Sequence, residues 1–181
     1  MARAKGTVVV GLVRALRKDK ERAKVVLPVN LLHYLQERIV VASWYPLEDY
    51  IALLRAVGKM SGRPTTETYI EMGRISARDH MDGTYSRLKK SVNRQAAFTL
   101  LTSMYDTGEM KVLERAPGHA LLEWNGFAQP AREVCDTFTG YQAQRMESQG
   151  FEEVTVRHIK CRADGAPSCR WDVAWKGRAM L

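Results

Sequence analysis

The sequence lacks the signatures of several large protein classes. No apolar run approaches the roughly 20 residues that a membrane-spanning helix needs. GxSxG, HExxH, GxGxxG and P-loop motifs are absent, and the three cysteines form no CxxC pair. No internal repeat or low-complexity segment interrupts the chain. We therefore expect neither a transmembrane protein nor a member of the commonest hydrolase, metalloprotease or nucleotide-binding classes.

The remaining composition is that of an ordinary globular protein. The chain has 181 residues, 45% of them hydrophobic and 27% charged, which is typical of one domain with a substantial core. Near the N-terminus, basic residues precede an apolar run from Thr7 to Val13, as in a signal peptide. Arg14 ends this run, and no small-residue cleavage site follows before Arg17. We interpret the segment as part of a mature cytoplasmic protein.

Positive charge is concentrated at the start of the chain. The net charge is +8, and residues 1–24 hold eight basic residues against two acidic ones. We treat residues 1–27 as a basic N-terminal segment, whose apolar stretch could pair across a twofold axis in a homodimer, and residues 28–181 as a single domain. A nucleic acid or another anion would contact Arg14, Arg17, Lys18, Lys20, Arg22 and Lys24. We favour a solvated basic segment instead, because interleaved aromatic residues and a helix-turn-helix signature are both missing.

Hydrophobic periodicity predicts an α+β fold. Helical spacing follows Pro28, and further helices are predicted from Pro46 to about residues 58–62, from Pro64 to Gly83, and over 92–105. Thr7 to Leu16 reads as a short strand or an entry segment. Alternating residues around Pro117-Gly118 predict a β-hairpin, followed by a helix over 130–150 and strands over 154–159 and 169–175. The expected architecture is N-terminal helices packed on an antiparallel sheet of about four strands.

The cysteines lie within the last third of the chain. Cys161 ends one predicted strand and Cys169 begins the next, and Cys135 starts the preceding helix. With His158 they would form a Cys3His set suited to zinc. A regular strand would point His158 and Cys161 to opposite faces, unless a bulge or an early end of the strand near Lys160 corrects the alternation. Spacing alone leaves two interpretations open: a metal site, or buried thiols with or without a hairpin disulfide.

Residues 134–177 carry a recognisable pattern: Cys135 followed by Phe138 and Gly140, then a strand ending at a cysteine, a glycine and a second cysteine eight positions on. In this pattern the segment resembles the C-terminal half of the 4-vinyl reductase (4VR) domain family of bacteria and archaea. Around Leu31, Trp44-Tyr45-Pro46 and Met72-Gly73-Arg74, the chain is similar to a myxobacterial paralogous family of unknown function. The resemblance implies a fold related to TRAPP subunits and to the sensor domains of aromatic-responsive activators. It also implies a zinc ion held by three cysteines, with His158 at the position of an acidic ligand.

The resemblance favours a small-molecule-binding or sensing function. We expect a structural zinc site and signalling through a partner or a dimer, with a 4VR-like part over about 107–177. A small apolar or aromatic ligand would occupy a cavity between helices and sheet, with these candidate lining residues: Trp124, Phe127, Phe98, Tyr105 and His80. The same aromatic residues could instead simply fill the core.

Two other functions remain as alternatives. One is an adaptor that binds a protein or a nucleic acid through the basic N-terminal segment. The other is a zinc-dependent enzyme, for which three thiolates and a water molecule would have to replace the closed four-ligand set. We expect no enzymatic activity, because the four histidines are scattered without paired carboxylates nearby.

Overall fold

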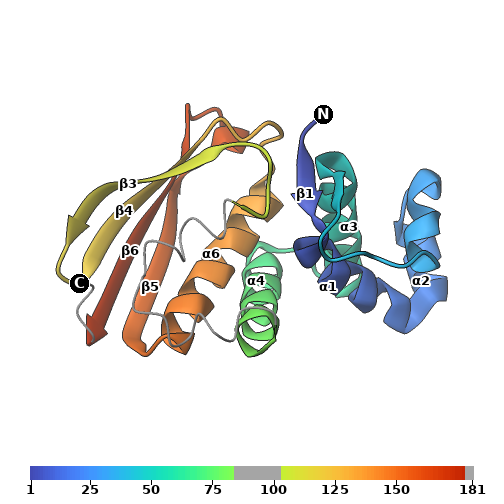
Figure 1. Ribbon diagram of the computed structural model, residues 1–181, viewed down its shortest axis with the longest axis horizontal. Coiled ribbons are helices and arrows are strands. Elements are labelled where there is room, and N and C mark those ends of the chain that lie inside the picture. The colour runs from blue at the N-terminus through green and yellow to red at the C-terminus, as the bar shows by residue number, and fades with distance from the viewer. Residues whose placement is uncertain (84–102, 178–181) are drawn as a thin grey trace.

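A computed structural model of the chain describes residues 1–83 and 103–177. Its fold is α+β, as predicted from the sequence, with helices packed on a four-stranded antiparallel sheet. The sheet, two long helices and a group of N-terminal helices follow one another across the molecule (Figure 1).

The N-terminal half is a compact group of short elements around one longer helix. A two-stranded antiparallel ribbon of β1 and β2 ties the start of the chain to α3. The elements are β1 (Arg3–Lys5), α1 (Gly6–Leu16), η1 (Arg17–Asp19), α2 (Lys20–Val26), η2 (Val29–Leu35), β2 (Trp44–Pro46) and α3 (Leu47–Met60).

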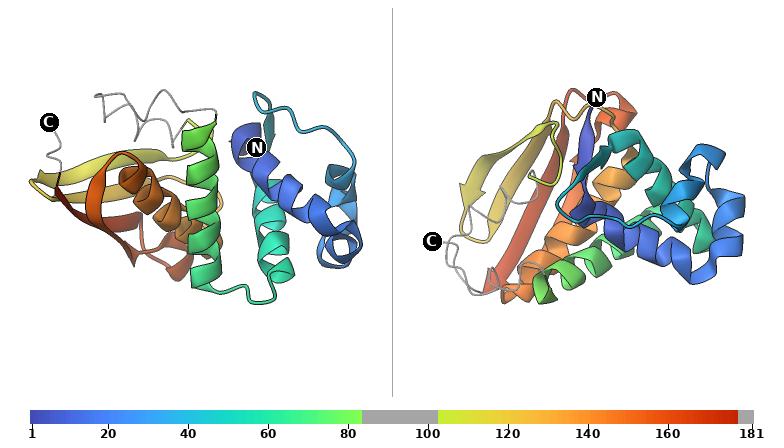
Figure 2. Two further views of the ribbon diagram at one scale, coloured as in Figure 1. Left: turned by 90° about the horizontal axis from the view of Figure 1, so that it is seen from below. Right: turned by 45° about the vertical axis from the view of Figure 1, so that its right-hand side comes forward.

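The C-terminal half is built on the four-stranded sheet. Its strand order is β3-β4-β6-β5, and each neighbouring pair is antiparallel. Its elements are β3 (Glu109–Ala116), β4 (His119–Asn125), α6 (Arg132–Ser148), β5 (Phe151–Lys160), η4 (Arg162–Asp164) and β6 (Cys169–Gly177). Helix α4 (Thr66–Asp82) lies beside α6, between the sheet and the N-terminal helices (Figures 1 and 2).

The prediction of a short strand or entry segment over Thr7–Leu16 is wrong, because this stretch belongs to helix α1. Its β-branched residues favour a strand locally. However, Val9, Val13 and Leu16 recur at helical spacing and are all buried, so tertiary packing of one face decides the conformation.

Most other predicted elements are confirmed. The predicted hairpin is β3–β4, the helix over 130–150 is α6, and the last two strands are β5 and β6. The segment after Pro28 forms the 3₁₀ helix η2 rather than an α-helix. The predicted helix over 92–105 lies largely outside the described residues; Tyr105 is described and forms an isolated bridge with Ala4.

Helices α4 and α6 cross at backbone contact through two glycines. A Cβ atom at Gly73 would lie 1.9 Å from the Thr137 carbonyl oxygen, and one at Gly140 would lie 1.8 Å from the Ile70 carbonyl oxygen. Only glycine permits this separation, because any Cβ would overlap the opposite helix. The close crossing fixes α6 between the sheet and α4.

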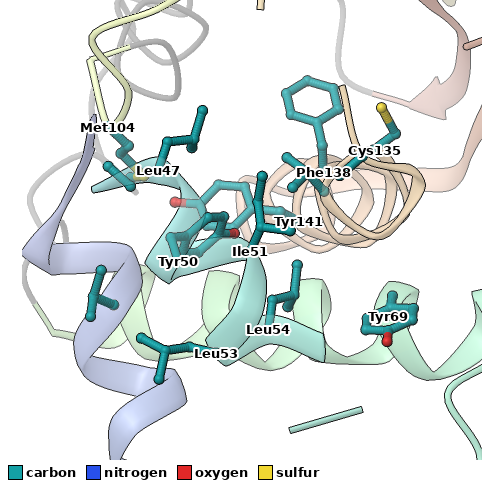
Figure 3. Close-up of a cluster of buried hydrophobic side chains, with 14 of the residues drawn as sticks. Leu47, Tyr50, Ile51, Leu53, Leu54, Tyr69, Met104, Cys135, Phe138 and Tyr141 are labelled. Carbon is teal, nitrogen blue, oxygen red and sulfur yellow. The ribbon is translucent and has the colours of Figure 1, made fainter. Parts of the chain in front are cut away.

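The apolar face of α3 joins the two halves. Figure 3 shows Leu47, Tyr50, Ile51 and Leu54 on the side of α3 that faces α6, from which Phe138 and Tyr141 project. Leu53 lies on the other side, towards α1. Within the described residues, no helix is long and apolar enough to cross a membrane.

Candidate functional site

Three cysteines and a histidine meet where α6 packs against the end of the sheet. Cys135 lies in the first turn of α6, His158 near the end of β5, Cys161 just after β5, and Cys169 at the start of β6. We call these four residues the thiol–imidazole cluster. Each offers one ligand atom, and these four atoms lie within 4.8 Å of one another.

A strand irregularity brings His158 and Cys161 to the same side. The pairing of β5 with β6 shifts between His158 and Lys160, so a bulge, one of the two irregularities considered from the sequence, is the one that occurs. The loop after Cys161 then turns tightly: the amides of Asp164 and Ala166 donate to the Cys161 carbonyl oxygen, at 3.1 and 3.0 Å. Gly165 completes this turn with a φ of 88°, in the left-handed region.

The distances between the cysteine sulfurs are those expected when one metal ion binds all of them, and they are too long for a disulfide. The Cys135 and Cys169 Sγ atoms are 3.5 Å apart, and those of Cys135 and Cys161 are 4.0 Å apart. A disulfide requires about 2.05 Å, and all three thiols are free and buried. Metal–sulfur bonds of about 2.3 Å in a tetrahedron would separate sulfurs by about 3.8 Å.

The His158 ring is fixed by stacking, but the hydrogen-bonding capacity of its nitrogens is not used. It stacks on the Trp171 indole, with centroids 4.7 Å apart and planes inclined by 13°. Both ring nitrogens are buried, and neither makes a hydrogen bond of good geometry among the described residues, although the ring is near enough to Cys169 to help lower the pKa of that thiol. A buried polar nitrogen normally has a partner, and a metal ion within the cluster would provide one.

The surroundings of the cluster favour at least one thiolate. A hydrogen bond from the Cys135 thiol lowers the pKa of Cys169, and the Arg162 amide also donates to the Cys169 sulfur at 3.4 Å. Burial raises the pKa of Cys161. Arg132, which pairs with Asp136 and Asp164, adds a positive charge near these sulfurs. Such a donor set can hold a soft or borderline transition-metal ion.

A separate cleft of about 730 Å³ lies between the N-terminal helices and the pair α4 and α6. This volume is typical of small-molecule sites. Exposed charged residues border it: Arg14, Lys18, Asp79 and Asp82. Its apolar walls include Val8, Leu12, Leu54, Val57, Met72 and Phe138.

Inside the cleft, His80 connects three helices. Its Nδ1 lies 3.1 Å from the Tyr141 hydroxyl on α6, and its Nε2 lies 3.2 Å from the Thr7 carbonyl oxygen on α1. The carbonyl can only accept, so Nε2 carries the proton and Nδ1 accepts from Tyr141. Burial lowers the pKa of His80, which favours this neutral form.

The predicted ligand-binding residues fall into two groups. His80 and Tyr105 border the cleft. Trp124 and Phe127 pack behind Tyr105, with each ring centroid 5.5 Å from that of Tyr105, and neither borders the cleft. Phe98 lies outside the described residues. Thr7, Gly11, Tyr50 and Tyr141 also border the cleft and were not predicted from the sequence. Thr7 and Gly11 were missed because α1 did not read as a helix, and Tyr50 and Tyr141 because their helix faces indicated only core packing.

The basic N-terminal segment is partly engaged in the fold. Arg17 donates to the carbonyl oxygens of Tyr34 and Glu37, Arg14 lies 3.8 Å from the Asp79 carboxylate, and Lys24 pairs with Glu21 at 2.7 Å. Lys18, Lys20 and Arg22 are exposed on or beside α2. At least Arg17 therefore has a structural role.

Comparison with solved structures identifies the fold. The chain is similar to an H-NOX protein from S. oneidensis, with a TM-score of 0.69 and 12% identity over 96% of each chain. It is also similar to an oxygen-binding H-NOX domain related to soluble guanylate cyclases, with a TM-score of 0.65 and 17% identity over 98% of this chain and 97% of that one. An H-NOX mutant from K. algicida matches with a TM-score of 0.64 and 12% identity. It covers 96% of this chain and 97% of the other. No protein-family model and no curated protein matches the sequence.

Two predictions are corrected by these neighbours. The chain shares its fold with H-NOX domains over nearly its whole length, so the predicted membership of the 4VR family and the TRAPP-like fold are wrong. Zinc as the cofactor is also contradicted, because the similar structures from K. algicida and S. oneidensis are in Fe(II) states.

The histidines of this chain do not fit a histidine-ligated heme in the cleft. All four lie among the described residues. His33 and His119 lie outside the cleft and His158 lies in the thiol–imidazole cluster. His80 alone borders the cleft, and both of its ring nitrogens are hydrogen-bonded. Heme iron commonly takes such a nitrogen as its axial ligand.

Proposed function

We propose that the chain is a sensor domain that binds a small molecule in the cleft between its two halves. The observation that carries this proposal is the cleft itself, which combines apolar walls with buried polar groups on α1, α4 and α6. The shared fold with sensor domains supports it. Of the residues expected from the sequence, we retain His80 and Tyr105 as ligand contacts.

The position of the cleft suggests how binding would be transmitted. Ligand contacts would come from α1 on one side and from α4 and α6 on the other, so occupancy would change how the two halves pack. The hydrogen bond from His80 Nε2 on α4 to the Thr7 carbonyl oxygen on α1 crosses that boundary, and the Tyr141 hydroxyl on α6 holds the other nitrogen of the same ring. We propose that the signal passes to a partner protein or to a second copy of the chain. Val25 and Val29, which are 85% and 84% exposed, offer apolar contact area on the N-terminal helices.

We also propose that the thiol–imidazole cluster holds a metal ion through Cys135, His158, Cys161 and Cys169. Its support is the sulfur spacing and the two buried His158 nitrogens, which make no hydrogen bond of good geometry among the described residues. The ion would join α6 to β5 and β6, and would thereby hold the sheet against the helix behind the cleft. Its role is structural, because four protein ligands close the coordination sphere.

A cavity-filling variant tests the binding function. Gly11 borders the cleft on α1, and a Cβ atom at this position meets nothing within 4 Å. Gly11→Phe should therefore fold normally while its ring occupies the cleft. We expect that small aromatic and lipid-like compounds which raise the melting temperature of the wild type no longer do so in Gly11→Phe.

The matched control is Leu113→Phe, which adds an aromatic ring on the exposed strand β3, away from the cleft. It should respond to the compounds as the wild type does. Equal responses in Gly11→Phe and Leu113→Phe would contradict binding in the cleft.

A further inference from the structure

Among the residues that the structure describes, the cleft offers no side chain suited to bind heme iron. Besides histidine, heme iron takes a cysteine thiolate, a tyrosine, or a methionine opposite a histidine. All three cysteines belong to the thiol–imidazole cluster. Met72 and Met104 border the cleft, but the accompanying histidine would have to be His80, whose nitrogens are both engaged.

Two of the tyrosines that border the cleft, Tyr50 and Tyr105, are held as neutral phenols. Burial raises the pKa of Tyr50 to about 12 and that of Tyr105 well above its usual range. The Tyr105 hydroxyl donates to the Tyr50 hydroxyl at 3.1 Å, and the Tyr141 hydroxyl lies 3.1 Å from His80 Nδ1. A tyrosine that binds ferric heme does so as a phenolate, which these surroundings disfavour.

The charges around the cleft are balanced. Its charged lining residues among the described part of the chain are two cations, Arg14 and Lys18, and two anions, Asp79 and Asp82. The Arg14 guanidinium faces the Asp79 carboxylate at 3.8 Å. The two propionates of heme would require excess positive charge, whereas a neutral molecule would not.

One buried polar atom of the cleft has no partner. Thr7 borders the cleft and is 4% exposed, and its Oγ1 has no hydrogen-bond partner among the described residues. The carbonyl of the same residue is already engaged by His80. Because buried hydroxyls are normally hydrogen-bonded, this oxygen indicates a polar group on whatever occupies the cleft.

We propose that the cleft binds a neutral, iron-free molecule with an apolar or aromatic body and one hydroxyl or carbonyl group that hydrogen-bonds to Thr7 Oγ1. This inference rests on the proposed function and specifies its ligand class. It separates the chain from the heme-binding domains whose fold it shares.

Two probes of the same shape test the polar contact. 1-Naphthol and 1-methylnaphthalene differ by a hydroxyl in place of a methyl group, and each is titrated against the full chain by fluorescence. We expect 1-naphthol to bind about tenfold more tightly than 1-methylnaphthalene, because one hydrogen bond to a buried partner contributes about that factor. The difference should persist in Thr7→Ser and fall to about twofold or less in Thr7→Val, which keeps the side-chain shape.

Hemin provides the opposing test. It is titrated into the same protein, reduced, and exposed to NO while the absorption spectrum is recorded. We expect no stoichiometric complex with the Soret band of a coordinated heme. A 1:1 heme complex that responds to NO, or equal affinities of the two naphthalene probes for the wild type, would overturn the inference while leaving ligand binding in the cleft intact. Failure of both hemin and the naphthalenes to bind would instead overturn the proposed function, and the inference with it.

Discussion

The imidazole of His158 lies nearly parallel to the indole of Trp171, at 4.7 Å between centroids and 13° between planes. Trp171 is itself fixed, because it is fully buried and its Nε1 donates to Thr139 Oγ1 on α6 at 2.9 Å. The stacking therefore sets the direction of the His158 ring among the three sulfurs.

The first prediction follows from this arrangement. Protein purified without chelators should contain about one metal equivalent per chain, and Cys161→Ser should lose it and be destabilised by at least about 2 kcal/mol. The reason is that metal binding contributes to folding when the ligands come from separate elements. Elemental analysis and urea unfolding measure the two effects.

Ala163→Ser is the control, a neighbouring change in the same loop, and it should alter neither the metal content nor the free energy of unfolding. Three freely titrating thiols in metal-free protein, with unchanged stability of Cys161→Ser, would refute the site.

The helix crossing gives a second prediction. Gly140→Val should destabilise the protein by about 3 kcal/mol or more, because the new side chain would collide with the Ile70 carbonyl group on α4. Gly11→Ala is the matched control in an uncrowded helix, and it should stabilise by about 0.5–1 kcal/mol. Urea unfolding compares the two. A similar, small effect of both changes would mean that α4 and α6 do not cross at backbone contact.

A third prediction concerns the basic N-terminal segment. Arg17→Ala should lower the free energy of unfolding by about 1–3 kcal/mol, since it leaves the carbonyl oxygens of Tyr34 and Glu37 without their charged donor. Lys20→Ala removes the same charge from an exposed position and should change stability by less than about 0.5 kcal/mol. If both variants have wild-type stability but bind nucleic acid more weakly in a salt-dependent manner, the adaptor alternative gains support.

A fourth prediction is a loss of stability in mild acid through His80. Burial holds the pKa of His80 in the folded protein below the ordinary value of 6.5. As the pH falls through 6.5, the unfolded chain therefore takes up a proton that the folded protein does not, so stability is full above this pH and declines below it. Unfolding free energies at pH 7.5 and 5.5 should differ more for the wild type than for His80→Gln, which cannot titrate. Equal pH dependence of the two proteins would show that His80 is not buried in its neutral form.

The sequence pattern was most informative where local signals and packing agree. The hairpin at Pro117-Gly118 and helix α6 follow from alternation and turn residues. The bulge before Lys160 is one of the two irregularities that would let His158 and Cys161 share a metal ion. The four members of the thiol–imidazole cluster were found from spacing, because consecutive strands joined by a tight turn necessarily bring their ends together.

The cleft was not predictable in the same way. It is formed by residues from α1, α3, α4 and α6, whose contacts depend on how two halves of the chain pack. The β-branched residues from Val8 to Val10 favoured a strand, so helix α1 was not predicted. Nothing in the local sequence around Thr7 or Gly11 indicates that they border a cleft. Trp124 and Phe127 were predicted as lining residues because large aromatics are common in binding sites, yet here they pack in the core behind Tyr105.

Binding of a small molecule between the two halves is tested most directly by locating a ligand in crystals. 4-Iodophenol combines an aromatic body with a hydroxyl group, and its iodine is identified by anomalous scattering. We predict a single strong anomalous peak in the cleft bordered by Thr7, Tyr50 and Tyr141, and its loss in crystals of Gly11→Phe. A peak elsewhere on the molecule, or a peak in the cleft region that persists unchanged in Gly11→Phe, would contradict the proposed binding site.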